Sequence, residues 1–440
     1  MIILNKQNSS MKSQVAKRCM LLGFLLFLRC LNLNFIYPAV VAAAICIYFS
    51  DLRVATCVLF FLLPLGGVFK MAYGGTSFFT IISLLYIFRL IVKLGFRRET
   101  LSFVLIFFIF CLLHSSVEHL VTIVTITLGF VLISYAHDDY REDYPLMVYA
   151  FVSGLLVASV IGLFRAQLPL VAALSEVNSI KTGTLQYVDR FAGLHGNPNY
   201  FTLDVTIGIS CMIVLLCRHK TRAIDILLMM VLIVFGVMSV SQSFLLVLAI
   251  QLIMLLFAFS KMGAKKLLMM IVGGFFILAL VFFLAYDSIQ LYLFRVEDIS
   301  ESSLNDITTG RWDIWVSFLQ SLIRTPKIML TGSGIMEAFV SRRGAHNTFI
   351  ELVYTFGVIG TAIYLITLFR VARHPLRKKQ IVDKIIWIPI VSLLLRMMFI
   401  GIVTYDSLPY YFFLICVINN ALAASKPMER NSRYFKTPGV

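Results

Sequence analysis

Two arginines and one histidine lie in polar stretches that separate long apolar runs. Arg190 lies in Asp189-Arg190-Phe191-Ala192-Gly193, Arg311 in Gly310-Arg311-Trp312, and His346 in Ala345-His346-Asn347. Guanidinium groups suit bidentate contacts with phosphate oxygens, and a neutral imidazole can accept a proton from an attacking hydroxyl. These residue types therefore fit a group transfer in which a pyrophosphate is bound and a hydroxyl is activated.

The stretch around Arg190 ends in His195-Gly196-Asn197-Pro198-Asn199, directly before an apolar run. Asn197 is a favourable N-cap and Pro198 suits the first helical position, so a helix is predicted to start there. The N-terminus of a helix carries unpaired N–H groups and a partial positive charge, which favour phosphate. The alternative interpretation is that this stretch only forms a turn and that Arg190 pairs with Asp189.

A second helix is predicted directly after Arg311. The apolar residues there recur at helical spacing until Pro326; they are Trp312, Trp315, Val316, Leu319, Leu322 and Ile323. This pattern is typical of an amphipathic helix lying on a membrane interface. Thr331-Gly332-Ser333-Gly334 predicts a turn, and His346 precedes the next apolar run, whose positive helix end would lower the pKa of His346 and keep it neutral. A histidine at a helix start is also often only a cap or a packing residue.

Composition places these stretches in a membrane protein. Hydrophobic residues make up 60% of the 440 residues, charged residues 14%, and the mean hydropathy is +0.91, whereas soluble domains have roughly 45–50% apolar and about 25% charged residues. A helix needs roughly 20 apolar residues to cross a bilayer, which predicts an all-α, polytopic transmembrane helix bundle of about 12–14 spans. We expect a single integral membrane domain over 1–440. The candidate spans are 19–36, 37–50, 54–70, 77–95, 101–117, 119–136, 146–168, 199–217, 223–239, 243–259, 267–286, 348–368, 385–403 and 408–424. Because Arg29 interrupts the first and the second is short, these two could instead form a shorter N-terminal hairpin beside about twelve full spans.

The net charge of +16 comes largely from short gaps between apolar runs, such as those at Arg218, Lys261 and Arg370. Positive residues in short loops mark the cytoplasmic side of a membrane protein, so no nucleic-acid partner is implied. Alternation then predicts cytoplasmic termini and two large loops, 169–198 and 287–347, on the opposite face, the second containing a short interfacial helix.

The sequence lacks the motifs of metal and nucleotide chemistry. It has no GxxxxGK[ST], no HExxH, no acidic DxD and no Cys/His cluster, so no cofactor and no metal are expected. Ionisable residues within the apolar spans are functional hypotheses by default. Arg165, Asp204 and Arg396 are of this kind, although Asp204 could also serve only to pair within the bundle.

The polar motifs together resemble a known family. The series Asp189-Arg190-x-x-Gly193, Asn197-Pro198-Asn199, Gly310-Arg311-Trp312-x-x-Trp315, His346-Asn347-x-x-x-Glu351 and Gly357-x-x-Gly360 is similar to that of the O-antigen polymerase and O-antigen ligase superfamily of bacterial inner-membrane proteins. The resemblance is specific over about 189–370. It implies transfer of a glycan from undecaprenyl pyrophosphate to a sugar hydroxyl on the periplasmic face, without metal or nucleotide sugar.

The resemblance implies catalytic roles for three residues. Arg190 and Arg311 would bind the pyrophosphate, and His346 would position or deprotonate the acceptor. Expected substrate-binding residues are His195, Asn197, Asn199, Trp312, Trp315, Asn347 and Gln242. Members of the family often carry a Ser-Arg or Ser-Lys pair before the large loop, whereas this chain has Ser239-Val240-Ser241-Gln242-Ser243, with no positive charge.

Three functions remain open at the level of sequence. The Asn-Pro-Asn turn and the Gly-Arg-Trp run favour a polymerase, whose partners would be an undecaprenyl-pyrophosphate-linked oligosaccharide, membrane lipid and a chain-length regulator protein. A ligase that passes the finished glycan to lipid A-core is the alternative of the same class. A flippase for lipid-linked oligosaccharides is the alternative of another class, and it would be expected to concentrate polar residues along a path inside the spans.

Overall fold

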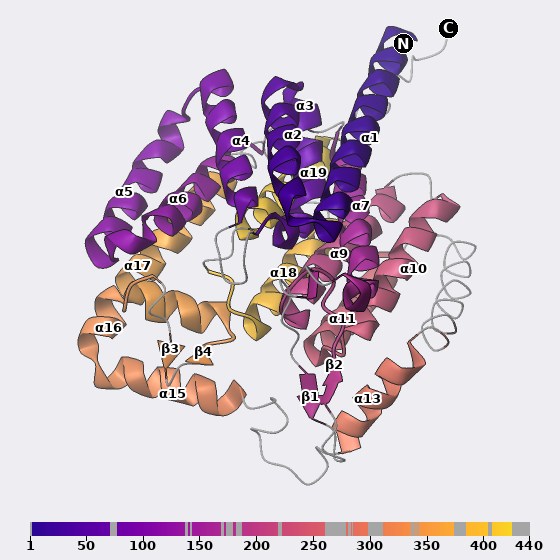
Figure 1. The fold of residues 1–440 in the computed structure, drawn as a ribbon. Helices are drawn as coiled ribbons and strands as arrows, with labels where there is room; N and C mark the ends of the chain where they lie inside the picture. Colours follow the sequence, from indigo (N-terminus) through magenta and orange to yellow (C-terminus); the bar gives the residue numbers. More distant parts are fainter. Residues whose placement is uncertain are drawn as a thin grey trace, which may run out of the picture.

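In the computed structural model the chain folds into a bundle of helices, as the predicted fold class requires (Figure 1). The structure describes residues 2–70, 77–136, 140, 143–168, 171–172, 179–181, 187–218, 222–259, 279, 283, 285–297, 311–335, 339–340, 343–373, 384–403 and 407–424.

Most helix bounds follow the predicted spans closely, but α1 begins at Ile2, well before the predicted start at 19, and ends at Leu31. In the first half of the chain the helices are α1 (Ile2–Leu31), α2 (Ile36–Phe49), α3 (Leu52–Leu62) with a 3-10 extension η2 (Leu63–Phe69), α4 (Phe78–Leu94), α5 (Arg98–His114), α6 (Leu120–Ser134) and α7 (Tyr144–Leu163). In the second half they are α9 (Pro198–Arg218), α10 (Ala223–Met238), α11 (Gln242–Phe259), α13 (Tyr286–Glu297), α15 (Arg311–Arg324), α16 (Pro326–Thr331), α17 (Thr348–Arg373), α18 (Trp387–Phe399) and α19 (Leu408–Ala424). The predicted span 267–286 falls almost entirely outside the described residues.

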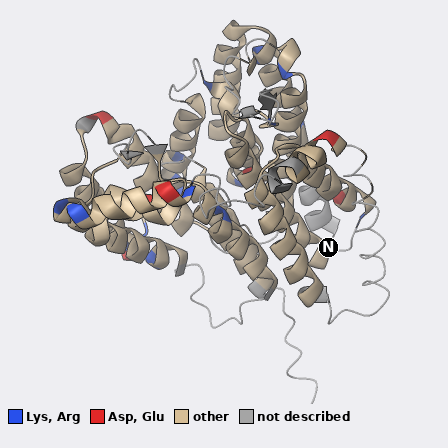
Figure 2. Cartoon of the chain, turned by 90° about the horizontal axis from the view of Figure 1, so that it is seen from below, with Lys and Arg blue, Asp and Glu red and all other residues tan. Residues whose placement is uncertain are grey.

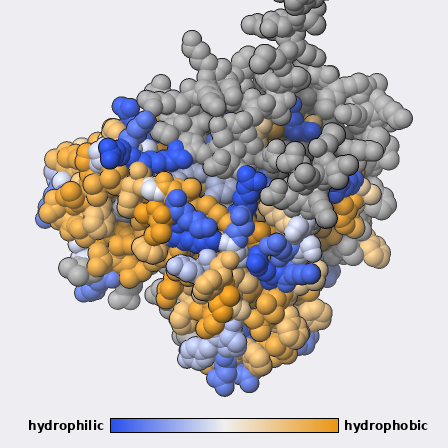
Figure 3. All heavy atoms as spheres, turned by 90° about the horizontal axis from the view of Figure 1, so that it is seen from above, coloured by the Kyte–Doolittle hydropathy of each residue, from blue (hydrophilic) through white to orange (hydrophobic). Residues whose placement is uncertain are grey.

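Several helices have the length and composition of membrane spans. The four that qualify among the described residues are Leu52–Phe69, Tyr144–Leu163, Pro198–Arg218 and Thr348–Ala372, and shorter apolar helices accompany them. Charged residues are sparse along the ribbon (Figure 2), and hydrophobic residues cover much of the coloured surface in Figure 3. Large apolar side chains that are more than half exposed include Phe49, Phe88, Leu113 and Phe257. So much exposed apolar surface indicates contact with a bilayer.

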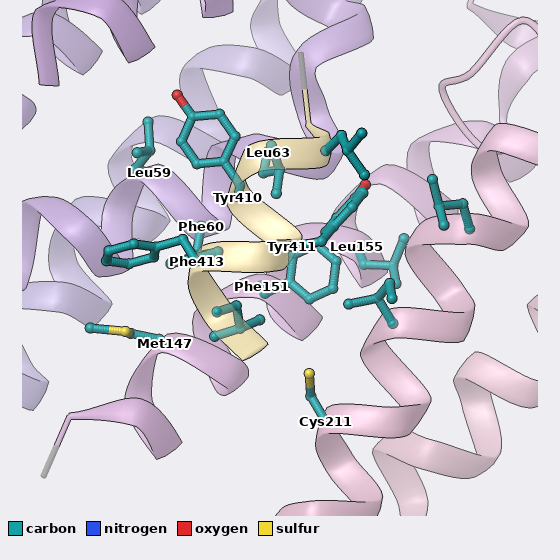
Figure 4. Packing of buried hydrophobic residues seen from close by; sticks show 14 of the residues in the cluster. Leu59, Phe60, Leu63, Met147, Phe151, Leu155, Cys211, Tyr410, Tyr411 and Phe413 are labelled. Atoms are coloured by element: carbon teal, nitrogen blue, oxygen red, sulfur yellow. The ribbon is translucent and has the colours of Figure 1, made fainter. Parts of the chain in front are cut away.

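The core lies where α3, α7, α9 and α19 meet. Figure 4 shows Phe60 of α3, Phe151 of α7 and Tyr411 of α19 around the start of α19. The ring centres of Phe60 and Phe413 lie 6.1 Å apart, and those of Phe151 and Tyr411 lie 6.2 Å apart. Aromatic pairs at this separation add to the packing of helices that have few polar contacts. This core fixes α9, whose start carries several of the predicted site residues.

The two large predicted loops contain secondary structure of their own. In the first, β1 (Ser179–Lys181) pairs antiparallel with β2 (Tyr187–Asp189), a ladder that the sequence analysis did not predict. The second holds α13, α15, α16 and the short pair β3 (Phe339–Val340) and β4 (Arg343–Gly344). In Figure 1, β1, β2, α13 and α15 lie at the bottom and the N-terminus of α1 lies at the top. The two polar segments therefore share one side of the molecule.

The amphipathic helix predicted after Arg311 is confirmed as α15. It ends at Arg324, before Pro326, and Phe318 on its inner side is fully buried. The Phe318 ring lies edge-on to Tyr354 of α17, with ring centres 4.8 Å apart. Ile323 on the outer side is 75% exposed. One apolar side of α15 thus packs on α17 and the other faces outward.

A kink in α17 anchors the segment that follows α15. Gly357 has a φ of 65°, so the helix breaks there. Near the break, the carbonyl of Tyr354 accepts the N–H of Ser333 at 2.8 Å and that of Thr355 accepts the N–H of Gly334 at 3.1 Å. Glycine adopts positive φ without steric cost, which also explains Gly334 (φ 97°) in the predicted turn. The turn is confirmed, and it ties α16 to α17.

Candidate functional site

Arg396, near the end of α18, joins the starts of α9 and α11. Its side chain is fully buried. One terminal nitrogen, Nη1, donates to the Ser243 hydroxyl at 2.7 Å, and Nη2 donates to the Asn199 carbonyl at 2.6 Å and to the Thr202 hydroxyl at 2.7 Å. Two helix starts that are separate in the sequence are therefore held by one guanidinium group.

The starts of α15 and α17 contact the residues that follow Arg396. The guanidinium of Arg311, the first residue of α15, lies 5.9 Å from the ring centre of Phe399, about one turn beyond Arg396. The Thr348 hydroxyl at the start of α17 donates to the Ile400 carbonyl at 2.6 Å. Four helix N-termini thus meet at the C-terminal end of α18, and each presents N–H groups and a partial positive charge.

The segment after α18 is held between α9 and α17. The Tyr200 hydroxyl donates to the Gly401 carbonyl at 2.8 Å, and the Val403 N–H donates to the Glu351 carboxylate at 3.4 Å. The carboxylate of Glu351, the last residue of the His-Asn-x-x-x-Glu series, therefore contacts the backbone of the segment after α18. Its contact fixes the position of the start of α17, and with it the turn that carries His346.

Arg190 lies against the turn between α10 and α11. Its Nε donates to the Ser239 carbonyl at 2.9 Å, and the next residue, Val240, has a φ of 49°. The Ser241 hydroxyl donates to the side-chain oxygen of Asn199 at 2.9 Å. This turn consists of Ser239, Val240 and Ser241. It links the Arg190 loop to the start of α9. The Asp189 side chain, the partner in the alternative interpretation of Arg190, lies outside the described residues.

The Arg190 loop is also seated on α7. Gly193 has a φ of 56°, and a Cβ added to Gly162 of α7 would lie 2.7 Å from the Gly193 Cα. Real Cβ atoms essentially never approach another heavy atom so closely, and here the neighbour is backbone. The absence of a side chain at Gly162 is what lets the loop reach this position.

Replacing Gly162 with alanine is therefore expected to push the Arg190 loop away from α7. Overpacking of this kind costs about 1–3 kcal/mol, so the variant should unfold at a lower temperature in detergent than the wild-type chain. Gly66→Ala is the matched control, because a Cβ there would meet the Phe79 side chain at 3.8 Å, an ordinary contact. Equal melting temperatures for the two variants would contradict the close seating of the loop.

His346 occupies a tight turn that is fixed on both sides. It has a φ of 47°, which is uncommon for a residue other than glycine. On one side the Trp315 indole N–H donates to the Ala345 carbonyl at 3.0 Å, and on the other the side chain of Asn347 accepts the N–H of Phe349 at 2.9 Å. Trp315 and Asn347, predicted as substrate-binding residues, thus hold the His346 turn in place.

His346 is partly exposed at the surface, while its ring is partly enclosed by protein atoms and lies within reach of the charge of Arg311. Burial by the surrounding protein lowers the pKa of His346, and the positive charge of Arg311 lowers this pKa further. The direction agrees with the prediction from sequence, which attributed the lowered pKa to the helix end instead. A neutral imidazole at pH 7 can accept a proton.

His195 is directed toward the bundle. Its Nε2 lies 3.0 Å from a carboxylate oxygen of Asp204, which is almost fully buried, and the other oxygen of Asp204 accepts the Tyr411 hydroxyl. Asp204 therefore pairs within the bundle, one of the two alternatives left open by the sequence. This contact fixes the loop before α9 to α19.

Asp204→Ala should lower the thermal stability of the chain, because it removes the acceptor of two buried or half-buried groups. Leaving one such group unsatisfied costs about 1–3 kcal/mol. The melting temperature in detergent measures the effect, and Asp287→Ala, at an exposed position at the start of α13, is the control. A melting temperature as high as that of the control would show that His195 and Tyr411 do not depend on Asp204.

The remaining predicted residues surround the same helix starts. The side chain of Asn197 accepts the N–H of Asn199 at 2.8 Å, which confirms Asn197 as the N-cap of α9. Gln242 begins α11 and is half-buried, and Trp312 at the start of α15 is 44% exposed. Their contacts with a sugar stay predictions.

The structure brings the predicted arginines together around a residue that the sequence analysis did not assign to the site. Arg311 and Arg190 both lie within electrostatic range of Arg396. Sequence had marked Arg396 only as an ionisable residue in an apolar span, and that was the available signal. Several guanidinium groups beside helix N-termini suit an anion with more than one charge, such as a pyrophosphate.

No protein-family model matches the chain, and no curated protein matches it. The chemistry of the residues around the end of α18 is therefore the basis for assigning a function.

Proposed function

We propose that the chain is a polysaccharide polymerase of the O-antigen type, a metal-independent glycosyltransferase. It would transfer the nascent glycan from undecaprenyl pyrophosphate to a sugar hydroxyl of an incoming lipid-linked repeat unit. The observation that carries this proposal is the meeting of Arg190 and Arg311 with four helix N-termini at the end of α18, beside His346. This arrangement supports both halves of the reaction, a leaving group rich in negative charge and a base for the attacking hydroxyl.

The proposed reaction is a displacement at the sugar carbon that carries the pyrophosphate. The acceptor hydroxyl oxygen forms a bond to this carbon while the bond from the carbon to the phosphate oxygen breaks. The electron pair leaves with undecaprenyl pyrophosphate, whose developing charge Arg190 and Arg311 stabilise. His346 takes the proton of the hydroxyl, which its lowered pKa permits because the neutral ring predominates at pH 7.

We further propose that the site lies on the periplasmic face of a bacterial inner membrane, with both termini cytoplasmic. The helices α9 and α17 start at the site and end at Arg218 and Arg373, next to gaps rich in lysine and arginine. Positive residues favour the cytoplasmic side. The segments 169–198 and 287–347 would then be the two periplasmic loops, and the apolar outer side of α15 would lie on the lipid.

The alternatives predict other arrangements. A lipid-linked oligosaccharide flippase would need polar groups along a path through the bundle, whereas Arg190, Arg311 and His346 lie beside helix starts at one end. A ligase would share the pyrophosphate site and differ in its acceptor, lipid A-core. A chain-length regulator is the proposed protein partner of the polymerase.

Deleting the gene from a strain that makes this glycan separates the three functions. Loss of a polymerase should leave lipid A-core carrying one repeat unit, loss of a ligase should leave none while lipid-linked polymer accumulates, and loss of a flippase should strand repeat units on the cytoplasmic side. Electrophoresis of the lipopolysaccharide and analysis of the lipid-linked pool give the answer. Unchanged long-chain lipopolysaccharide would refute the proposed function.

A further inference from the structure

Arg396 is a buried positive charge whose hydrogen-bond partners are all neutral. It is 0% exposed, and its hydrogen-bond partners in the described part of the chain are two hydroxyls, those of Ser243 and Thr202, and the backbone carbonyl of Asn199. Its Nε has no hydrogen-bond partner among the described residues. Neutral oxygens orient a guanidinium group, but they do not balance its charge.

The charged neighbours of Arg396 are also positive. Arg311 acts on it from α15 and Arg190 acts on it from the loop before α9, while Tyr292 of α13 supplies a phenol. The carboxylates in described ion pairs are engaged elsewhere, Asp143 with Arg53 and Asp204 with His195. Among the described residues no carboxylate acts on Arg396. Three clustered guanidinium groups raise the local potential and favour a multiply charged anion.

We propose that Arg396 is the buried positive centre of a phosphate-binding site whose outer members are Arg190 and Arg311. Arg396 acts as a positioning residue. Its hydrogen bonds fix the starts of α9 and α11 relative to each other, and its positive charge attracts a pyrophosphate to the two outer arginines. That this pyrophosphate belongs to a lipid-linked donor rests on the proposed function. Binding of free pyrophosphate does not.

The charge and the hydrogen bonds of Arg396 can be separated by substitution. Arg396→Gln keeps a donor and removes the charge, whereas Arg396→Lys keeps the charge and removes the planar fork. Ser243→Ala leaves the charge intact and deletes one partner of Nη1. If charge is what the site requires, the lysine variant and the serine variant will resemble the wild-type chain more closely than the glutamine variant does.

Arg89→Gln is the matched control for the loss of a buried arginine. Arg89 of α4 is only 6% exposed and donates to the carbonyls of Ile47 and Ser50 at the end of α2. Its substitution removes a buried guanidinium group whose hydrogen bonds to the described residues go to backbone carbonyls. It should reduce thermal stability without changing the affinity for a phosphate anion.

The test measures binding of inorganic pyrophosphate to the purified full-length chain in detergent, by calorimetry at two salt concentrations. Arg396→Gln should weaken the Kd about 10- to 100-fold, as expected for loss of a charge-assisted interaction. Arg396→Lys should stay within about tenfold of the wild-type chain and Arg89→Gln within about threefold. Ser243→Ala, which loses one contact to the start of α11 but keeps the charge, should weaken binding less than Arg396→Gln does. The salt dependence should fall only in Arg396→Gln.

An unchanged Kd in Arg396→Gln, an equal loss in Arg89→Gln, or no binding by the wild-type chain would overturn the inference. Gel filtration shows whether Arg396→Gln folds. If it does not fold, Arg396→Lys decides the question, because loss of binding in a folded Arg396→Lys chain excludes charge as the cause. The two proposals fail separately. Pyrophosphate binding that depends on Arg396 in a chain that makes no polymer would refute the polymerase and keep the anion site.

Discussion

Replacing Arg311 with alanine should slow glycan transfer about 10²- to 10³-fold, the loss seen when one charged or hydrogen-bonding stabiliser of a transition state is removed. Arg311 is half-exposed at the start of α15, with its guanidinium over Phe399, so truncation should leave the fold intact. Arg311→Lys should recover only part of the rate, because lysine lacks the planar fork that contacts two phosphate oxygens. Polymer length in vivo and transfer between lipid-linked repeat units in vitro both measure the effect.

Arg324→Ala provides a control on the same helix. Arg324 is the last residue of α15 and is exposed, so its substitution removes the same charge from the other end of the same element. Polymer length should remain as in the wild-type chain. A full-length polymer in Arg311→Ala, or an equal loss in Arg324→Ala, would remove Arg311 from the proposed site.

The helices themselves could be read from the sequence because each is specified locally. Asn197 and Pro198 predicted the start of α9, and the structure places the helix start at Pro198 with Asn197 as its cap. The spacing of apolar residues after Arg311 predicted α15, and Pro326 marked its end. Caps, proline and periodicity act over a few residues, so a local pattern is sufficient to locate them.

The elements without such a pattern were missed. The sequence predicts a loop from 287 onward, but α13 forms over Tyr286–Glu297, a mostly apolar stretch with Asp287 near its start and Glu297 at its end. The ladder of β1 and β2 was also missed, because its strands are only three residues long. Segments this short depend on their neighbours for stability.

The position of Arg396 in the site could not be predicted from a local pattern at all. Arg396 contacts the Asn199 carbonyl across 197 residues of sequence. Apolar spans of similar composition give no information on which helices become neighbours, because any apolar face can pack against another in a bilayer. What the sequence did show was an arginine inside an apolar span, and such a residue requires polar partners.

His346→Ala should lower the rate of glycan transfer about 10²- to 10⁴-fold, the usual contribution of a general base. The fold should persist, because His346 is exposed and the turn is held by Trp315 and Asn347. The matched control is His119→Ala, a histidine in the turn before α6. A wild-type rate in His346→Ala would leave the proton transfer to another group.

The pH dependence separates a base from a residue that only shapes the turn. The lowered pKa of His346 means that the ring stays neutral to a pH below the usual range of histidine, so the rate of the wild-type chain should be constant near neutrality and fall only at lower pH. Arg311 is one of the two causes of the lowering. Arg311→Gln should therefore raise the pKa of His346 and move the acidic fall in rate toward higher pH, in addition to reducing the maximal rate. Arg324→Gln should not move it. If the rate falls at the same pH in the wild-type chain and in Arg311→Gln, His346 is not the group that accepts the proton. A shift of this fall to higher pH requires both that Arg311 acts on His346 and that the neutral imidazole accepts the proton.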